Sequence, residues 1–473
     1  MGNLWFAVAN VMIAAVVLAF IAAAAVIIRP IVAARNEPLG PASALAVSVG
    51  GLGLFIFLFA AAGWIAIGKW RLFPELWWLL PALAWIGVAI ALSATMVAPL
   101  RSRLAMPRVA WRILPPLALL AWLVGVDLLV CFDPEFHTDA LWYHLTLPHY
   151  WLTEGGLRPH PTLTLAGYPL LTEMIYMVPV SYGLPFATRV LHLAFGVGVV
   201  LAIHGYLRRQ LSASAALAFA AAFFIFDPVN EVATWANTDL ARTFFLVAAA
   251  ASLASYANRG ERRDLLVGAV LSGLAMSTTY IAIVFGNGLL TIALVAATAR
   301  PGVRARRIAR DLAIFWSVSA AVLSPWLVKN LIHYGQPFYG LEGTNLRLPL
   351  AQLVTDYLGF VLVAFWVLAR RKSDPGERLL ALYLLFYLIA GTFQMPPIKR
   401  FFLPVYAVGL MLIGRVAAPL FASRRWLEIA FPVALLAFAV AVTCYQWYYH
   451  FFEDALRFLF QNSPPEWTII WHH

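Results

Sequence analysis

The chain has 473 residues, of which 63% are hydrophobic and only 12% are charged, and its mean hydropathy is +0.82. A soluble domain carries about twice this charged fraction, so the composition excludes a soluble globular protein and indicates a polytopic membrane protein. The net charge of +11 comes from short basic clusters between apolar runs, a pattern typical of membrane topology signals that argues against a nucleic-acid partner.

About fourteen apolar runs are long enough to cross a membrane, at roughly 20 residues for each crossing. The sequence therefore predicts an all-α fold, a bundle of transmembrane helices. The expected spans cover residues 4–28, 42–68, 75–99, 112–131, 188–207, 212–229, 239–257, 264–282, 283–299, 311–332, 355–370, 378–394, 401–420 and 426–446.

These runs divide the chain into three parts. Residues 1–108 hold three spans with no charged residue except Glu75, at the first position of the third, and we expect them to form an additional N-terminal unit. Residues 109–446 hold the remaining spans and a large loop at 132–187. A short tail, 447–473, follows the last span.

Basic residues are distributed unequally between the loops. Of the 33 Lys and Arg residues, 23 fall in alternate loops, which the positive-inside rule places in the cytoplasm. Both termini and loop 132–187 then face outward. The expected location is the cell inner (plasma) membrane, with the functional site on the outer face, where the loops are longest and chemically most varied.

Loop 132–187 contains two segments with apolar residues at helical spacing, 139–152 and 169–180. Aromatic residues such as Trp142 and Trp151 are typical of the membrane interface. We therefore expect two amphipathic helices lying on the membrane surface in this loop.

The same loop begins with a dense polar cluster formed by Asp133, Glu135, His137 and Asp139. Such a cluster at a membrane face can supply a general base or a metal site, and the alternative is the solvated start of a loop. The histidines of the loop fit no standard ligand spacing, so no metal site is predicted from them. A divalent cation held by carboxylates stays an alternative.

A second acidic cluster includes Asp239, which opens the span at 239–257, and Arg242 follows one helical turn later. This carboxylate either takes part in the functional site or caps the helix N-terminus. Because both segments emerge on the same face, we expect Asp239 to lie close to Asp139. Two neighbouring carboxylates need a cation between them, for which Arg242 or a divalent ion is the candidate.

The order of these motifs resembles the GT-C class of polytopic glycosyltransferases, in particular bacterial members related to protein O-mannosyltransferases and to the lipid A aminoarabinose transferase. The resemblance covers roughly residues 113–420. The motifs that carry it are Asp139 with Tyr143-His144, Tyr168-Pro-Leu-Leu171 with Glu173, Ala187-Thr-Arg-Val-Leu-His192, Asp239, Ser324-Pro-Trp-Leu-Val-Lys-Asn330 with Tyr334-Gly-Gln-Pro-Phe-Tyr339, and Lys399-Arg-Phe-Phe-Leu-Pro404.

The resemblance implies an enzyme that moves a sugar from a polyprenyl-phosphate donor to a hydroxyl of a lipid-linked glycan, a lipid or a protein, with inversion at the sugar carbon. It implies Asp139 as general base. Asp133, Glu135 and Asp239 are acidic alternatives or supporting groups. Cations at the outer ends of spans would stabilise the leaving phosphate. The residues expected to bind donor phosphate or substrate are Lys329, Arg400, Tyr143, His144, Asn330 and Arg242.

Two other function classes stay open at this point. A transporter or lipid flippase would need charged groups along a path through the membrane, and Asp127 and His204 are the nearest to such positions. A non-catalytic membrane subunit is the third possibility. Most ionisable residues instead gather at the ends of spans, which favours chemistry at the membrane surface.

Overall fold

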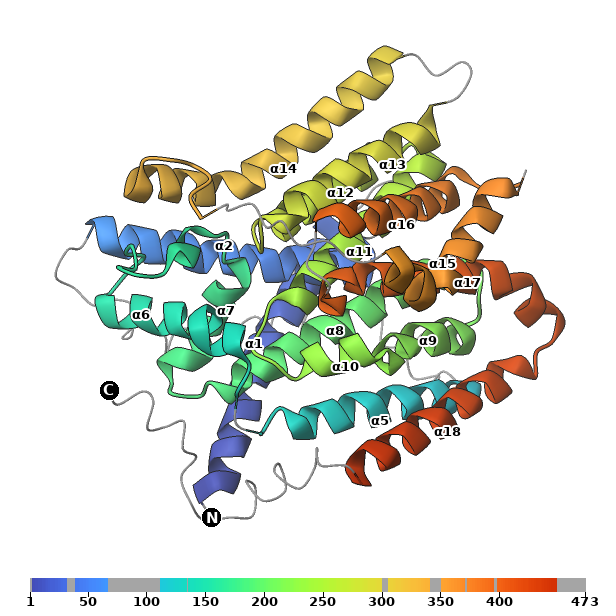
Figure 1. The fold of residues 1–473 in the computed structure, drawn as a ribbon, viewed down its shortest axis with the longest axis horizontal. Coiled ribbons are helices and arrows are strands. Elements are labelled where there is room, and N and C mark those ends of the chain that lie inside the picture. The colour runs from blue at the N-terminus through green and yellow to red at the C-terminus, as the bar shows by residue number, and fades with distance from the viewer. Residues whose placement is uncertain are drawn as a thin grey trace, which may run out of the picture.

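The computed structural model of the chain describes residues 2–31, 39–66, 111–133, 135–299, 305–340, 350–370, 372–394 and 398–448. Every regular element among them is a helix, which confirms the predicted all-α fold (Figure 1). The expected span at 75–99 and almost all of the tail at 447–473 lie outside the described residues.

Long helices make up most of the bundle. They are α1 (Gly2–Ile31), α2 (Pro41–Ala66), α5 (Leu114–Val130), α8 (Phe186–Leu207), α11 (Asp239–Arg259), α12 (Arg262–Met276), α13 (Leu289–Thr298), α14 (Ala305–Tyr334), α15 (Leu350–Ala369), α16 (Pro375–Gln394), α17 (Leu403–Ser423) and α18 (Leu427–Tyr448). The shorter helices and turns are η2 (Trp111–Ile113), η3 (Ala140–His144), α6 (Thr146–Glu154), η4 (Thr164–Gly167), α7 (Leu171–Ser181), α9 (Ala213–Ala221), η5 (Ala222–Ile225), α10 (Asp227–Ala233), η6 (Ile283–Gly288) and η7 (Lys399–Phe402).

Eight of the described helices are long and apolar enough to cross a membrane. The number rises to nine if α9 with η5 and α10, which meet at a bend of 74°, count as one broken span. The expected total of fourteen therefore stays a prediction, while the multi-pass character of the chain is confirmed.

Helix α11 lies at the centre of the bundle and packs against α8, α12 and α16 (Figure 1). Small residues allow this close approach. A Cβ atom on Gly198 of α8 would lie 3.0 Å from the ring of Phe244, and one on Gly268 of α12 would lie 2.8 Å from Leu253. Small residues at helix contacts are the usual means of close packing inside a bilayer, where water drives no association.

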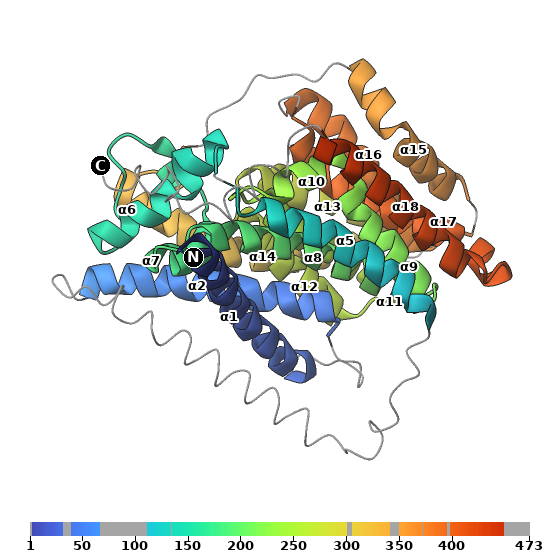
Figure 2. The ribbon, with the colours of Figure 1, turned by 90° about the horizontal axis from the view of Figure 1, so that it is seen from below.

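Helices α1 and α2 pack against α8, and α2 also contacts α7. A Cβ atom on Gly53 of α2 would lie 2.7 Å from Leu171, so the glycine lets α2 lie directly on α7. In the view of Figure 2, α1 and α2 occupy one side of the bundle and α15 to α18 the other. The first two spans therefore belong to the packing of the described bundle.

Loop 132–187 forms η3, α6, η4 and α7. Helices are present in both expected segments, but the structure corrects the position of the second one. All residues of α7 from Leu171 to Pro179 are buried, because α2, α6 and α8 pack around it. Helix α7 is therefore an internal helix and not an amphipathic helix on a membrane surface.

Candidate active site

Arg400 lies between the two acidic clusters that the sequence singles out. Its Nη2 donates a hydrogen bond to the carboxylate of Asp139. Its Nε lies 3.7 Å from Oδ2 of Asp239. The side chain of Asp139 is 25% exposed, whereas those of Arg400 and Asp239 are 13% and 5% exposed. One partly enclosed guanidinium therefore bridges both carboxylates, and Asp139 is the member that solvent or a substrate reaches most easily.

Asp239 is held at the head of α11, and it also binds Arg242 one turn later. Nη2 of Arg242 lies 2.7 Å from Oδ1 of Asp239, and both side chains are buried. Arg400 sits in η7, just before α17. The ring centroid of Phe401 lies 5.4 Å from the guanidinium carbon of Arg242 and 5.5 Å from that of Arg400. This cation–π geometry places two positive groups beside one another at a single span head.

The Nε–H groups of Arg242 and Arg400 are buried and donate no hydrogen bond within the described part of the chain. That of Arg400 faces Oδ2 of Asp239 at 3.7 Å, beyond hydrogen-bond length, whereas that of Arg242 has no hydrogen-bond acceptor among the described residues. An unsatisfied buried donor is costly, and native structures seldom keep one without a reason such as a ligand. The two guanidinium groups therefore keep donor capacity for an anion.

His137 supports Arg400 from the other side. Its Nε2 lies 3.2 Å from Nη1 of Arg400, and its ring stacks on Trp235 at a centroid distance of 3.8 Å. Burial and the charge of Arg400 lower the pKa of His137. The imidazole is therefore neutral near pH 7, so Nε2 accepts the hydrogen bond from Arg400.

Glu135 connects the first acidic cluster to the chain before α11. Its carboxylate accepts hydrogen bonds from the backbone N–H groups of Ala236, at 2.8 Å, and of His137, at 3.0 Å. Arg189 lies 3.8 Å from Glu135 and also donates to the backbone carbonyl of Asp133. Glu135 and Asp133 thus belong to a network around Arg189 that shapes the loop, beside the Asp139–Arg400–Asp239 cluster.

His144 forms a buried pair with Glu173 of α7. Nδ1 of His144 lies 2.6 Å from Oε1 of Glu173, and the two side chains are 2% and 0% exposed. The ring of Tyr143 lies 3.9 Å from that of His144. Burial and the charge of Asp139 raise the pKa of Tyr143 well above its ordinary value. Tyr143 is therefore a neutral hydroxyl close to the acidic cluster.

Lys329 and Asn330 form a second cluster on α14. Nζ of Lys329 donates to the carbonyl of Ala166 at 2.6 Å, and Nδ2 of Asn330 donates to the carbonyl of Gly167 at 2.6 Å. Asn330 also donates to the hydroxyl of Tyr280 at 2.8 Å. Within the described residues, no contact joins this pair to Asp139, Asp239 or Arg400. The structure therefore does not bring Lys329 together with Arg400.

No group of three or more His, Cys, Asp and Glu side chains in the described ranges could hold a metal ion. Between Asp139 and Asp239, the guanidinium of Arg400 stands where a divalent cation would have to bind both carboxylates. The residues present there therefore fit a bridging arginine and do not fit a shared metal.

The sequence matches no family model, and no curated protein matches it. Among solved structures, the chain is similar to ArnT from Cupriavidus metallidurans, whose structure was determined with bound undecaprenyl phosphate. The TM-score is 0.50, the sequence identity is 15%, and the match covers 72% of this chain and 74% of ArnT. The chain shares its fold with ArnT. The GT-C-like fold that the sequence predicts is thereby confirmed.

In this ArnT-like bundle, the sequence analysis did not single out two aromatic side chains of the site, Trp235 and Phe401. Trp235 precedes Asp239 by four residues and stacks on His137, and Phe401 follows Arg400 and contacts two arginines. Their aromatic character beside a charged span head was the available signal, but it equally fits the interfacial aromatics of any membrane protein.

Proposed function

We propose that the chain is a membrane glycosyltransferase that moves a sugar from a polyprenyl-phosphate donor to an acceptor hydroxyl on the outer face of the inner membrane. The observation that carries the proposal is the position of Arg400, between an accessible Asp139 and a buried Asp239. The fold shared with ArnT, a protein whose structure holds undecaprenyl phosphate, supports the class of donor.

Arg400 and Arg242 suit the leaving group of this reaction. Negative charge grows on the donor phosphate as the bond to the sugar breaks, and fixed cations stabilise that charge. The guanidinium groups of both arginines supply charge-assisted hydrogen bonds to phosphate oxygens. Phosphate binding would satisfy the Nε–H of Arg242, which has no hydrogen-bond acceptor among the described residues.

Asp139 is the proposed general base. Its carboxylate takes the proton of the acceptor hydroxyl while the hydroxyl oxygen forms a bond to the anomeric carbon. The bond from that carbon to the phosphate oxygen breaks, and polyprenyl phosphate leaves with the bonding electron pair. A single displacement of this kind inverts the configuration of the sugar carbon.

Arg400 also gives a reason for the order of these events. With no donor bound, its Nη2 donates a hydrogen bond to Oδ2 of Asp139 and so occupies an oxygen that the acceptor hydroxyl needs. A donor phosphate competes for the same guanidinium and loosens this contact. Asp239 remains paired with Arg242, so it serves to hold the arginines and not to accept the proton.

Tyr143 and the His144–Glu173 pair complete the proposed site. Tyr143 keeps its proton over the whole physiological range, so its hydroxyl is a donor for a sugar oxygen. The buried His144–Glu173 pair fixes the turn that carries Tyr143, because both side chains are enclosed and bonded to one another. Lys329 and Asn330 are assigned to holding the loop at 164–167.

The proposal is tested in a strain that lacks this chain. We expect mass spectrometry of its lipids, envelope glycans and envelope proteins to show loss of one sugar increment from the acceptor. Wild-type protein restores the increment, and Asp139→Asn at equal abundance does not.

Loss of lipid transport with every sugar increment intact would instead favour a flippase. An unchanged profile together with the loss of a partner protein from the membrane would favour a non-catalytic subunit.

A further inference from the structure

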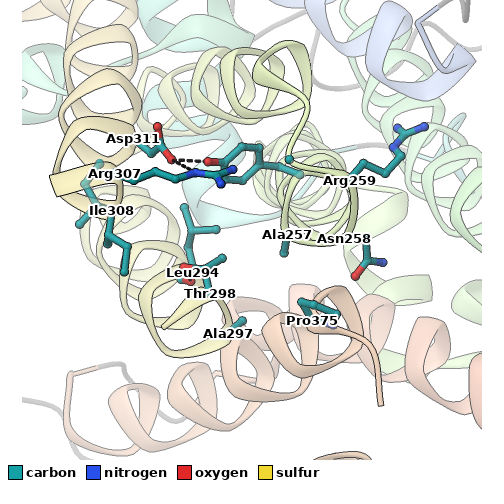
Figure 3. A pocket seen from close by; sticks show the side chains of 13 residues that line it. Ala257, Asn258, Arg259, Leu294, Ala297, Thr298, Arg307, Ile308, Asp311 and Pro375 are labelled. Atoms are coloured by element: carbon teal, nitrogen blue, oxygen red, sulfur yellow. Dashed lines mark hydrogen bonds and ion pairs between the residues drawn. The ribbon is translucent and has the colours of Figure 1, made fainter. Parts of the chain in front are cut away.

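A cavity of about 280 Å³, lined by no residue of the proposed active site, lies at the other end of α11 (Figure 3). The ends of four helices surround it: the C-terminal ends of α11 and α13 and the N-terminal ends of α14 and α16. We propose that this cavity binds the phosphate-bearing head group of an anionic membrane phospholipid.

The cavity is at the opposite membrane surface from Asp139 and Arg400. Helix α11 begins at Asp239, in the proposed active site, and ends at Arg259, in the cavity wall. With 21 residues, α11 is about 30 Å long, which equals the hydrocarbon thickness of a bilayer. The asymmetry of basic residues predicts that this second surface is cytoplasmic, where anionic lipids meet the protein.

The wall of the cavity carries an excess of positive charge. The carboxylate of Asp264 is shared by Arg259, at 2.8 Å, and Arg263, at 3.1 Å. The carboxylate of Asp311 is shared by Arg307, at 3.7 Å, and Arg310, at 3.1 Å. Of these groups, Arg259, Arg307 and Asp311 line the cavity itself, and the others are their ion-pair partners outside the lining. Two guanidinium groups against one carboxylate in the wall leave a net attraction for an anion.

Arg307 reaches across the cavity toward the end of α11. Figure 3 shows its side chain beside that of Asp311, and the carboxylate of Asp311 also accepts a hydrogen bond from the hydroxyl of Tyr256. Gly260, with φ of +70°, leaves room for this approach, because a Cβ atom there would lie 3.3 Å from Nη2 of Arg307. The side chain of Arg307 is 54% exposed and that of Arg259 is 35% exposed, so both can turn toward a bound phosphate.

One part of the lining is apolar, and this part favours a lipid over a free phosphate. Leu294 and Ala297 of α13 and Ile308 and Leu312 of α14 form one part of the wall. Helix α14 packs chiefly on α12 and makes little contact with α13, so the cavity lies in a gap between membrane helices. Basic pockets between spans on the cytoplasmic side commonly hold anionic lipid head groups.

The test measures lipid retention by the full chain. Protein purified in detergent and stripped of lipid is incubated with phosphatidylglycerol or with phosphatidylcholine, and bound lipid is counted by native mass spectrometry. We expect a phosphatidylglycerol adduct in the wild type, and about tenfold weaker binding in the Arg259→Gln/Arg307→Gln double variant. The matched control is Arg424→Gln/Arg425→Gln, which removes the same charge from a turn outside the cavity and should bind as the wild type does.

Two further measurements separate loss of the cavity from loss of folding and lipid binding from phosphate binding. Ala297→Phe fills the cavity without changing any charge, and it should reduce binding even if the double variant folds poorly. Soluble glycerol 3-phosphate should not displace the lipid at equal concentration. Equal phosphatidylglycerol binding by all variants, or full displacement by glycerol 3-phosphate, would overturn the proposal. Neither outcome bears on the transferase assignment, since no sugar transfer is measured.

Discussion

Arg400 donates a hydrogen bond to the carboxylate of Asp139, 261 positions earlier in the chain. The contact joins the first loop after α5 to the turn before α17, and it brings a cation and a partly exposed acid to one membrane surface. In the proposed mechanism, a phosphate bound to the guanidinium competes with this hydrogen bond and frees the carboxylate for the acceptor hydroxyl. The two members of the pair should therefore respond differently to substitution.

Asp139→Asn should reduce turnover by at least about 100-fold, because the amide keeps the shape of the side chain but cannot accept the acceptor proton. The measurement is sugar transfer by protein in proteoliposomes, with binding of undecaprenyl phosphate as the control for folding. A nearly normal Asp139→Asn enzyme together with an inactive Asp133→Asn enzyme would move the general base to Asp133.

Arg400→Gln should raise the donor Michaelis constant roughly 10- to 100-fold, the usual cost of a lost hydrogen bond to a charged group. Lys329→Met is the matched comparison, because it neutralises the other outer-face cation that the sequence suggested. Lys329 donates a hydrogen bond to the Ala166 carbonyl and not to the acidic cluster. The Michaelis constant of the Lys329→Met variant for the sugar donor should therefore stay within about twofold of wild type. Equal effects of both substitutions would place Lys329 back in the phosphate site.

Asp239→Ala should destabilise the protein and abolish activity. The change leaves Arg242, which is 3% exposed, without its counter-charge, and breaking a buried ion pair in this way costs about 3–5 kcal/mol. Asp239→Asn keeps the shape of the side chain and part of its hydrogen bonding. It should therefore be more stable than Asp239→Ala but equally inactive. Full activity of Asp239→Ala would reduce Asp239 to a helix cap.

Glu173→Ala should lower stability by about 1–3 kcal/mol, because it leaves the buried Nδ1 of His144 without a partner. The double variant Glu173→Ala/His144→Phe removes both polar groups and should recover part of that loss. Thermal unfolding of the three proteins provides the measurement. Additive losses in the double variant would show that the pair does not act as a unit.

The predicted orientation is tested by cysteine labelling at positions 160 and 305. His160→Cys should react with an impermeant reagent from outside, and Ala305→Cys should react only after the membrane is opened. Cys444 is first replaced by serine. Cys131 is buried with 0% exposure, so the reagent does not reach its thiol and the background is small. Labelling of position 305 in intact cells would reverse the orientation and place the active site inside.

The sequence predicts that Asp139 and Asp239 emerge on one surface, which permits the shared contact with Arg400 seen in the structure but does not by itself require it. The identity of the bridging cation did not follow. Arg242 is one turn from Asp239 and does bind it, whereas Arg400 reaches both acids only because η7 folds beside the head of α11. Which span heads become neighbours depends on helix packing, and the sequence pattern of each separate span carries little information about it.

The same limit explains the error on α7 and the separation of Lys329 from the acidic cluster. Residues 169–180 have the pattern of a half-exposed helix, but α2 lies across the face that was expected to be open. Span ends on one membrane surface can be far apart laterally. The periodicity that predicts each helix gives its length and depth in the bilayer but not its neighbours.

Helix α11 is held at both ends by ion pairs to other elements, Asp239 with Arg400 at one surface and Arg259 with Asp264 at the other. In α11, as in α8, 83% of the most apolar 18-residue stretch is buried, whereas the corresponding share is 17–28% for α1, α5 and α18. A helix pinned in this way cannot slide or tilt to match a thicker bilayer. Hydrophobic mismatch therefore affects the peripheral helices and the lipids around them. A change in acyl-chain length should alter the tilt of these peripheral helices before it alters the distance between the charged ends of α11.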